Sequence, residues 1–323
     1  ATTWAANGDL GAVYEKASPE VYAGIGGSAE LSAANALPEW RTSYLAHTDD
    51  RRVFFHTSNG VGAAEENDAE YMGFGVDASV SSVGMTLRND DLVMMGTLGL
   101  ANTDVEGDHL SGSGNGAVLG LSAMGDFGAP GGGLWSVSLT HAMLDSDGTR
   151  ISNNGSVGFS GVGASASQLS AGLEWQSDYD RWGFGARAGV AFGSVDTDAF
   201  TESTSAANLL DTMAVEGMSY DYSYLDLGAR IGAQASKSVD LFLDLGASIP
   251  LDNSGFDIDA AYDEGQGAFS VESKGMTERE LWLGAGASVE FANGADLQLE
   301  LGASEDWQGS TSFVGSLSVG MSF

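Results

Sequence analysis

The most constraining feature of this chain is a repeated alternation of large apolar residues with small or polar ones. In the final segment, from Phe313 to Phe323, the odd positions are mostly large and apolar and the even positions are mostly small or polar. Successive side chains of a β-strand point to opposite faces, so this segment predicts a strand with one apolar face. The same alternation recurs at 168–175, 182–192, 241–249, 281–291 and 297–304.

The length of the alternating segments favours a membrane protein. Most come close to the roughly 9–11 residues that a tilted transmembrane strand needs, whereas a soluble strand usually has about five or six. The mean hydropathy of −0.04 does not contradict this, because an apolar and a polar face cancel in any average. No apolar run approaches the roughly 18 residues of a membrane-spanning helix.

The connections between the predicted strands support a barrel. Links after even-numbered strands are short, as at 88–91 and 236–239, whereas those after odd-numbered strands are mostly long, as at 147–165, 197–219 and 252–279. Short turns on one side and long loops on the other are typical of outer-membrane barrels. We therefore predict an all-β fold, a transmembrane antiparallel up-and-down β-barrel of about twelve strands. The predicted strands are 52–61, 70–87, 92–104, 116–127, 134–146, 166–178, 182–196, 220–236, 239–250, 280–292, 296–306 and 312–323.

The predicted inner faces are mostly glycine, serine and alanine, so they leave space for a wet lumen. In the second strand, Phe74, Val76 and Val80 are predicted to face outward together with Val83 and Met85, which requires a β-bulge near residues 81–82. Scattered charges are predicted to face the lumen, namely Asp77, Glu174, Arg187, Asp226, Arg230, Asp244, Glu290 and Glu300.

The first fifty residues differ from the rest of the chain. Ser18 followed by Pro19 is typical of a helix N-cap and first turn, and the stretch that follows is rich in alanine, glutamate and leucine up to about Leu37. Pro38 is predicted to end this helix. We divide the chain into residues 1–50, a linker and a pore helix, and residues 51–323, the barrel; the helix could occupy the lumen.

Three of these features resemble the C-terminal β-barrel translocator domain of autotransporters. They are Ser18-Pro19-Glu20-Val21-Tyr22 before the helix, Met72-Gly73-Phe74-Gly75-Val76-Asp77 on an early strand, and the terminal Phe323. The resemblance implies a twelve-stranded barrel in a bacterial outer membrane, with a helix through the pore and an N-terminal passenger exported to the cell surface. It also implies that the barrel assembly machinery recognises the last strand, with Val319, Met321 and Phe323 as its signal.

Charge and residue usage exclude other classes. With 45 acidic and 12 basic residues the net charge is −33, which repels nucleic acid. Cysteine is absent, so disulfides and thiolate metal sites are excluded. No cofactor or metal is expected, because His47, His56, His109 and His141 lack metal-ligand spacing and the acidic residues of one long loop lack EF-hand spacing. That loop contains Asp252, Asp257, Asp259, Asp263 and Glu264.

Two functions other than export are open on sequence grounds. A small-molecule porin or channel would share the barrel, but it would not need residues 1–50. An outer-membrane enzyme or adhesin would carry its activity in the long loops, where no catalytic motif occurs. Self-cleavage of a passenger at Asn35 by acidic lumen residues is disfavoured against an ordinary polar helix residue, and we name no catalytic residue.

Overall fold

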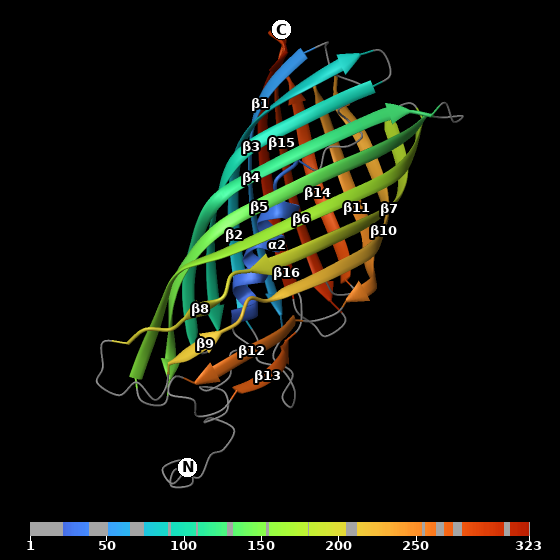
Figure 1. The fold of residues 1–323 in the computed structure, drawn as a ribbon. Coiled ribbons are helices and arrows are strands. Elements are labelled where there is room, and N and C mark those ends of the chain that lie inside the picture. The colour runs from blue at the N-terminus through green and yellow to red at the C-terminus, as the bar shows by residue number, and fades with distance from the viewer. Residues whose placement is uncertain are drawn as a thin grey trace.

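A computed structural model describes residues 22–38, 51–64, 74–89, 92–107, 109–127, 132–152, 155–179, 181–204, 212–253, 256–262, 268–273, 280–306 and 311–322. Twelve of the described strands close into an antiparallel barrel around a single helix (Figure 1). The predicted fold class is therefore confirmed. Within the described residues, no helix is long and apolar enough to cross a membrane.

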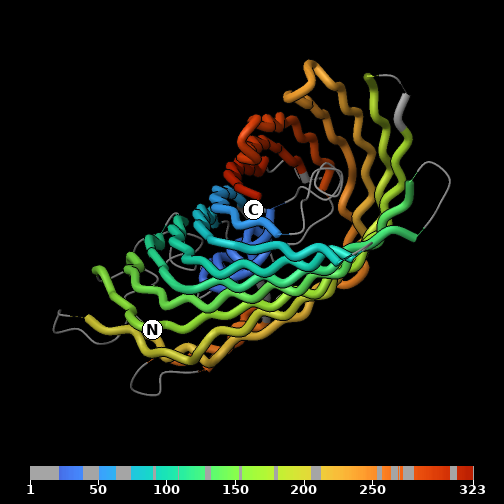
Figure 2. Tube along the Cα trace, turned by 90° about the horizontal axis from the view of Figure 1, so that it is seen from above, coloured from blue at the N-terminus to red at the C-terminus, as the bar shows by residue number. Residues whose placement is uncertain are grey.

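The barrel strands follow one another around the wall in chain order, and the last one pairs with the first. Phe55 of β1 lies opposite Val319 of β16, which closes the sheet, and Figure 2 shows these two strands side by side. The strands are β1 (Arg51–Ala64), β2 (Phe74–Asn89), β3 (Leu92–Gly107), β4 (Leu110–Asp126), β5 (Gly133–Ser152), β6 (Gly155–Tyr179), β7 (Trp182–Thr197), β10 (Ser219–Ser236), β11 (Val239–Asn253), β14 (Glu280–Glu290), β15 (Ala295–Asp306) and β16 (Thr311–Ser322).

The alternation in sequence becomes two faces of the wall. On β11, Leu241, Leu243 and Leu245 are exposed on the outside, while Asp244 between them is buried. A closed barrel pairs all its backbone groups within the sheet, so its outer face can be apolar and contact lipid. The predicted two-faced strands are therefore the membrane-spanning wall.

The predicted β-bulge in β2 is wrong. The strand pairs with both neighbours without a register shift, and Phe74, Val76 and Val80 are buried inside the barrel. Val83 and Met85 are exposed on the outside, as expected, because odd positions face outward along the whole strand. The apolar even positions face a helix rather than lipid, and sequence alone does not distinguish these two apolar surroundings.

The predicted pore helix is α2 (Ala23–Ala34), which lies inside the barrel (Figure 1). The proposed N-cap Ser18 and Pro19 lie outside the described residues. The helix ends earlier than expected, at Ala34, and Asn35 caps it with its backbone N–H. Ten of its twelve residues are buried. Because protein surrounds it on most sides, the helix has no need for a polar face.

Two of the predicted long loops contain a second sheet. The segments β8 (Phe200–Thr201), β9 (Met213–Val215), β12 (Phe256–Tyr262) and β13 (Ala268–Ser273) form a four-stranded sheet, here called the lid. The lid lies at the end of the barrel opposite the C-terminus (Figure 1). Its inner face, which includes Met213, Val215 and Ile258, is buried and joins the same apolar core as α2.

The third predicted long loop, 147–165, is mostly strand. β5 and β6 continue past the expected boundaries up to Ser152 and from Gly155, with one register shift between Ser146 and Gly148. Their glycine, serine and aspartate residues resemble loop sequence, but the two strands pair with each other and so satisfy their backbone groups. This hairpin extends the wall to the height of the lid.

Candidate functional site: the lumen and its mouth

The helix packs against only part of the lumen wall. It contacts strands β2 to β7, and its buried residues form one apolar core with side chains from these strands. Among them are Phe74 and Val80 of β2, Val105 of β3 and Leu144 of β5. Burial of apolar area contributes about 25 cal/mol per Å², so this core stabilises the helix in the lumen.

Glycines allow the helix to approach the wall closely. A Cβ atom at Gly24 of α2 would collide with Val105 and crowd Phe74. At the other end of the helix, a Cβ atom at Gly60 or Gly120 of the wall would collide with Asn35 or Leu37, respectively. The close contact between helix and wall therefore depends on glycine residues, which have no side chain, on both surfaces.

Three residues from distant parts of the chain meet where the helix begins, and we call Tyr22, Arg150 and Glu202 the mouth network. Arg150 Nε donates to Glu202 Oε1 at 2.7 Å, and Arg150 Nη2 donates to Glu202 Oε2 at 2.8 Å. The Tyr22 hydroxyl donates to Glu202 Oε1, and the backbone N–H of Met213 donates to Oε2 at 2.8 Å. The helix, β5 and the lid therefore share one carboxylate.

The mouth network is removed from solvent. The side chains of Arg150 and Glu202 are 1% and 0% exposed. Burial, followed by the negative charge of Glu202, raises the pKa of Tyr22 well above its usual range, so the phenol stays protonated and donates. Phe159 and Phe200 both pack edge-on against the Tyr22 ring, with centroids 5.4 and 4.9 Å away. The charges are therefore enclosed by aromatic rings.

Further along the helix, polar contacts to the wall fix its position. Glu30 accepts a hydrogen bond from the hydroxyl of Tyr220 on β10. The hydroxyls of Ser58 and Thr97 donate to the carbonyls of Asn35 and Ala36, at 3.2 and 2.9 Å. These bonds satisfy carbonyls that the end of a helix leaves without an intrahelical partner.

The opposite wall of the lumen is charged. On β10 and β11, Arg230 and Asp244 form a bidentate ion pair with N–O distances of 2.6 and 2.5 Å. Arg187 of β7 lies 3.5 Å from Asp226, and its guanidinium lies 4.3 Å from the centre of the Trp282 ring. Trp282 Nε1 in turn donates to Asp226 at 3.2 Å.

Most of the predicted lumen charges belong to this charged wall. Glu300 is buried on β15, and Glu174 lies opposite Arg187 in the pairing of β6 with β7. Glu290 is exposed at the end of β14, beside the short turn to β15. The prediction for Asp77 is wrong, because this residue is exposed on the outer face of β2 and accepts a hydrogen bond from Asn59. Its inward assignment depended on the bulge that does not exist.

A cavity of about 380 Å³ lies between the end of the helix and the charged wall. Asn35 and Leu37 line it on one side, and Arg187, Asp226 and Asp244 line it on the other. The helix therefore fills one side of this part of the lumen and leaves on the other a space that charged residues help to line.

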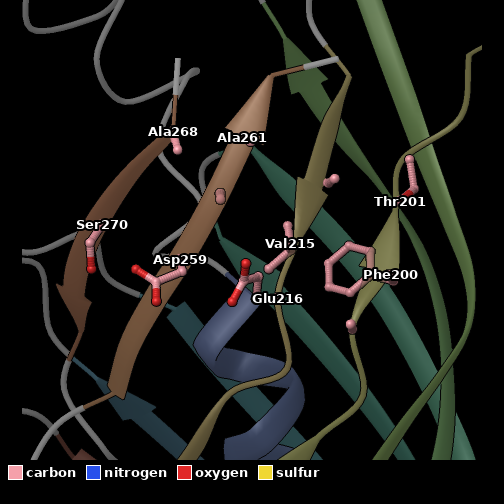
Figure 3. Close-up of a pocket in the computed structure, with 11 residues that line it drawn as sticks. Phe200, Thr201, Val215, Glu216, Asp259, Ala261, Ala268 and Ser270 are labelled. Carbon is pink, nitrogen blue, oxygen red and sulfur yellow. The ribbon is translucent and has the colours of Figure 1, made fainter. Parts of the chain in front are cut away.

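The outer face of the lid carries a shallow groove of about 590 Å³ (Figure 3). Exposed Glu216 and Asp259 lie beside small residues such as Ala261 and Ser270. Asp257 and Asp259 of the acidic loop segment are thus lid residues, while Asp263 and Glu264 lie outside the described residues.

The histidines are not gathered into a metal site. Across the part of the chain that the structure describes, no three histidine, aspartate or glutamate side chains lie close enough to hold a metal ion. His56 and His141 each form a hydrogen bond with a serine hydroxyl, at 2.9 and 2.8 Å. His47 lies outside the described residues.

The residues of the predicted assembly signal lie on the outside of the last strand. Val319 and Met321 are 43% and 52% exposed on the lipid face of β16, and Phe323 lies outside the described residues. The mouth network was not predicted. Its one signal in the sequence is Arg150, a cation within a long glycine- and serine-rich stretch of a chain with only 12 basic residues.

Comparison with known proteins agrees with this architecture. The family model described as the autotransporter β-domain matches residues 53–302. No curated protein sequence matches the chain.

Solved structures of similar fold come from translocators and from a channel. The translocator domain of the autotransporter NalP from Neisseria meningitidis has a TM-score of 0.68 at 17% identity, over 85% of this chain and 89% of that one. The transport unit of AIDA-I from Escherichia coli has a TM-score of 0.62 at 10% identity, over 94% and 99%. The Pseudomonas putida toluene transporter TodX has a TM-score of 0.50 at 10% identity, over 93% of each chain. At these identities the likeness concerns the fold alone.

Proposed function

The chain belongs to the autotransporter β-domain family and is an outer-membrane translocator, and we propose that residues 22–38 mark the route that its passenger takes through the pore. This is a family of transporters rather than enzymes. The proposed division of the chain follows from the same reasoning: residues 1–50 contain the linker and pore helix, and residues 51–323 form the barrel.

One observation carries the proposal: α2 lies inside a closed lipid-facing barrel, and Tyr22, its N-cap residue, reaches the mouth. The helix is the part of the chain nearest in sequence to an N-terminal passenger. Tyr22 contacts Glu202 beside the lid, and the lid lies at the end of the barrel opposite the C-terminus. A passenger attached before Tyr22 therefore leaves on the lid side, which is the cell surface when the short turns are periplasmic.

The wall chemistry suits passage of a polypeptide. The charged side of the lumen presents ion pairs and small residues, so an extended chain can keep its backbone hydrated there. The apolar side then receives α2 once the helix occupies the pore. The lumen therefore serves both as a conduit and as a binding site for the final segment.

We further propose that the barrel assembly machinery recognises β16. Val319 and Met321 form an exposed apolar stripe on the strand that closes the barrel, and Phe323 continues the same alternation in sequence. The variant Met321→Ser should lower the amount of folded barrel in cells. Leu243→Ser is its matched control, since it removes a similarly exposed apolar side chain from β11.

The export function is tested by fusing a small reporter to either end of the chain, behind a signal peptide. The reporter at the N-terminal end should be cleaved by protease added to intact cells, whereas the same reporter after Phe323 should be protected. Both fusions must show the heat-modifiable mobility of a folded barrel. Protection of the N-terminal reporter in cells with folded barrel would refute export.

A small-molecule channel is the second candidate, favoured by the cavity beside α2 and by the fold that TodX shares. The intact chain should then conduct freely in a planar bilayer. Translocation predicts a low conductance that rises when residues 22–38 are deleted, because the helix leaves the lumen.

A further inference from the structure

Glu202 connects three structural units that are separate in sequence. Its carboxylate accepts four hydrogen bonds, from the Tyr22 hydroxyl, two nitrogens of Arg150 and the backbone of Met213. A carboxylate has about four acceptor positions, so Glu202 is saturated only when helix, wall and lid are all in place. Such charge-assisted bonds in a buried site are the strong ones.

Within the described residues, the lid closes over one segment of chain, the start of α2. Its inner residues Ile258 and Met213 are fully buried, as is Tyr22, and all three belong to one continuous apolar core. Protein interiors are close-packed, so a second chain segment beside Tyr22 would push the lid away from the mouth. Glu202 would then lose its contact with Tyr22 and Arg150.

We propose that the mouth network is a latch for the end of export: Glu202 binds Tyr22 and Arg150 only when no passenger remains beside the helix, and it then holds the lid shut. Glu202 is a positioning residue, since it acts through the lid and the helix. The inference rests on the proposed export function. It adds that the barrel has a closed state, which forms only after the passenger has left the pore.

The absence of cysteine makes the state of the lid measurable. A single cysteine in Ala260→Cys, buried on the inner face of the lid, reports opening through its rate of reaction with a membrane-impermeant maleimide on intact cells. Ala214→Cys, exposed on the outer face, gives the reference rate. In the otherwise unchanged chain, Ala260→Cys should react far more slowly than Ala214→Cys.

Two substitutions remove parts of the latch. Tyr22→Phe removes only the donated hydroxyl, and Glu202→Gln removes the buried negative charge. A hydrogen bond to a charged group contributes enough that labelling at position 260 should rise about tenfold or more in each variant. Glu216→Gln is the matched control, because it makes the same change at an exposed lid carboxylate, and it should leave the rate unchanged.

A purely structural role would give a different result. If the network merely stabilised the fold, the heat-modifiable unfolding temperature of the barrel would fall together with the rise in labelling. The latch predicts faster labelling with an unchanged barrel transition in Tyr22→Phe. Unchanged labelling in both variants, or a parallel loss of barrel stability in Tyr22→Phe, would overturn the proposal.

A stalled passenger tests the link to export. A disulfide-closed domain fused before Tyr22 should jam in the pore, and position 260 should then react quickly although the network is intact. Slow labelling with a jammed passenger would refute the latch and leave surface display of the ordinary reporter untouched. Conversely, a failure to display any reporter would refute export, while the labelling of Tyr22→Phe would still decide whether the network holds the lid.

Discussion

The two sides of the lumen are built from opposite chemistries. The side formed by β2 to β7 presents apolar residues such as Phe74, Val105 and Leu144 to α2. The side formed by β7, β10, β11, β14 and β15 carries the ion pairs of Arg187 and Arg230, and Arg187, Asp226 and Asp244 line the cavity beside the helix. The helix covers the first side, and on the second it contacts β10, where Tyr220 donates to Glu30.

This difference shows that the helix completes the barrel as much as it blocks it. Without α2, the apolar side would face a wet lumen and lose the burial that stabilises it. On the charged side, the charged residues pair with one another across neighbouring strands, so these ion pairs do not depend on the helix. Substitutions on each side should separate these two kinds of stability.

Arg230→Met should destabilise the charged side most. Arg230 pairs with buried Asp244 and lies within electrostatic reach of Glu300 and Glu174, so its loss leaves three carboxylates without their central cation. We expect a loss of about 4 kcal/mol in unfolding free energy, measured by urea titration in detergent. The double variant with Asp244→Leu should recover most of the lost unfolding free energy. A loss that persists in the double variant would show that packing, rather than charge, decides stability on this side.

Phe74→Ala should destabilise the helix-covered side by about 3 kcal/mol, because it leaves a cavity beside the helix. In a chain lacking residues 22–38 the same substitution should cost about 1 kcal/mol or less, since the neighbours of Phe74 in α2 are gone. Arg230→Met should cost the same in both chains. Equal costs of Phe74→Ala in both chains would contradict the division of the lumen into two independent sides.

Gly24→Leu should displace the helix at a cost of about 2 kcal/mol, because its side chain has no room beside Val105. Conductance in a planar bilayer should rise at the same time, as the helix is loosened from the wall. Gly232→Leu on β10 is a control for added bulk, since the nearest atom to its Cβ is 3.7 Å away. An unaltered conductance in Gly24→Leu would show that the close approach is not needed for plugging.

Asp77→Ala should have the smallest effect, about 0.5 kcal/mol or less, because the side chain is exposed and forms one surface hydrogen bond with Asn59. Urea titration in detergent measures this change in unfolding free energy, as for the other variants. A loss as large as that of Arg230→Met would show that Asp77 faces the lumen after all.

The wall was predictable because lipid imposes a strict rule on it. Leu243, Val319 and Met321 all face outward at alternate positions, as their sequence pattern requires. The phase of β2 does not follow from its sequence pattern, because Phe74 and Val76 are apolar for another reason, which is their place in the core around α2. Periodicity detects an apolar face but not what covers it.

The lid and the mouth network cannot be predicted from the sequence, and the reason is different. Strands β8 and β9 have two and three residues, too few for any alternation. Their partner β12 follows only after the whole of β10 and β11, so the sheet exists through non-local pairing. Glu202 likewise meets Tyr22 across 180 positions of sequence, and nothing local marks either residue as a partner.

The seam between β1 and β16 has a consequence for how the molecule forms. These strands are the first and last of the barrel, and their pairing joins Arg52 with Ser322. Until that pairing exists, the sheet has two open edges whose unpaired N–H and C=O groups invite association with other chains. Contacts between residues so far apart are also the slowest to form. The half-made cylinder is therefore the species most exposed to aggregation, and its protection before closure sets the yield of functional molecules.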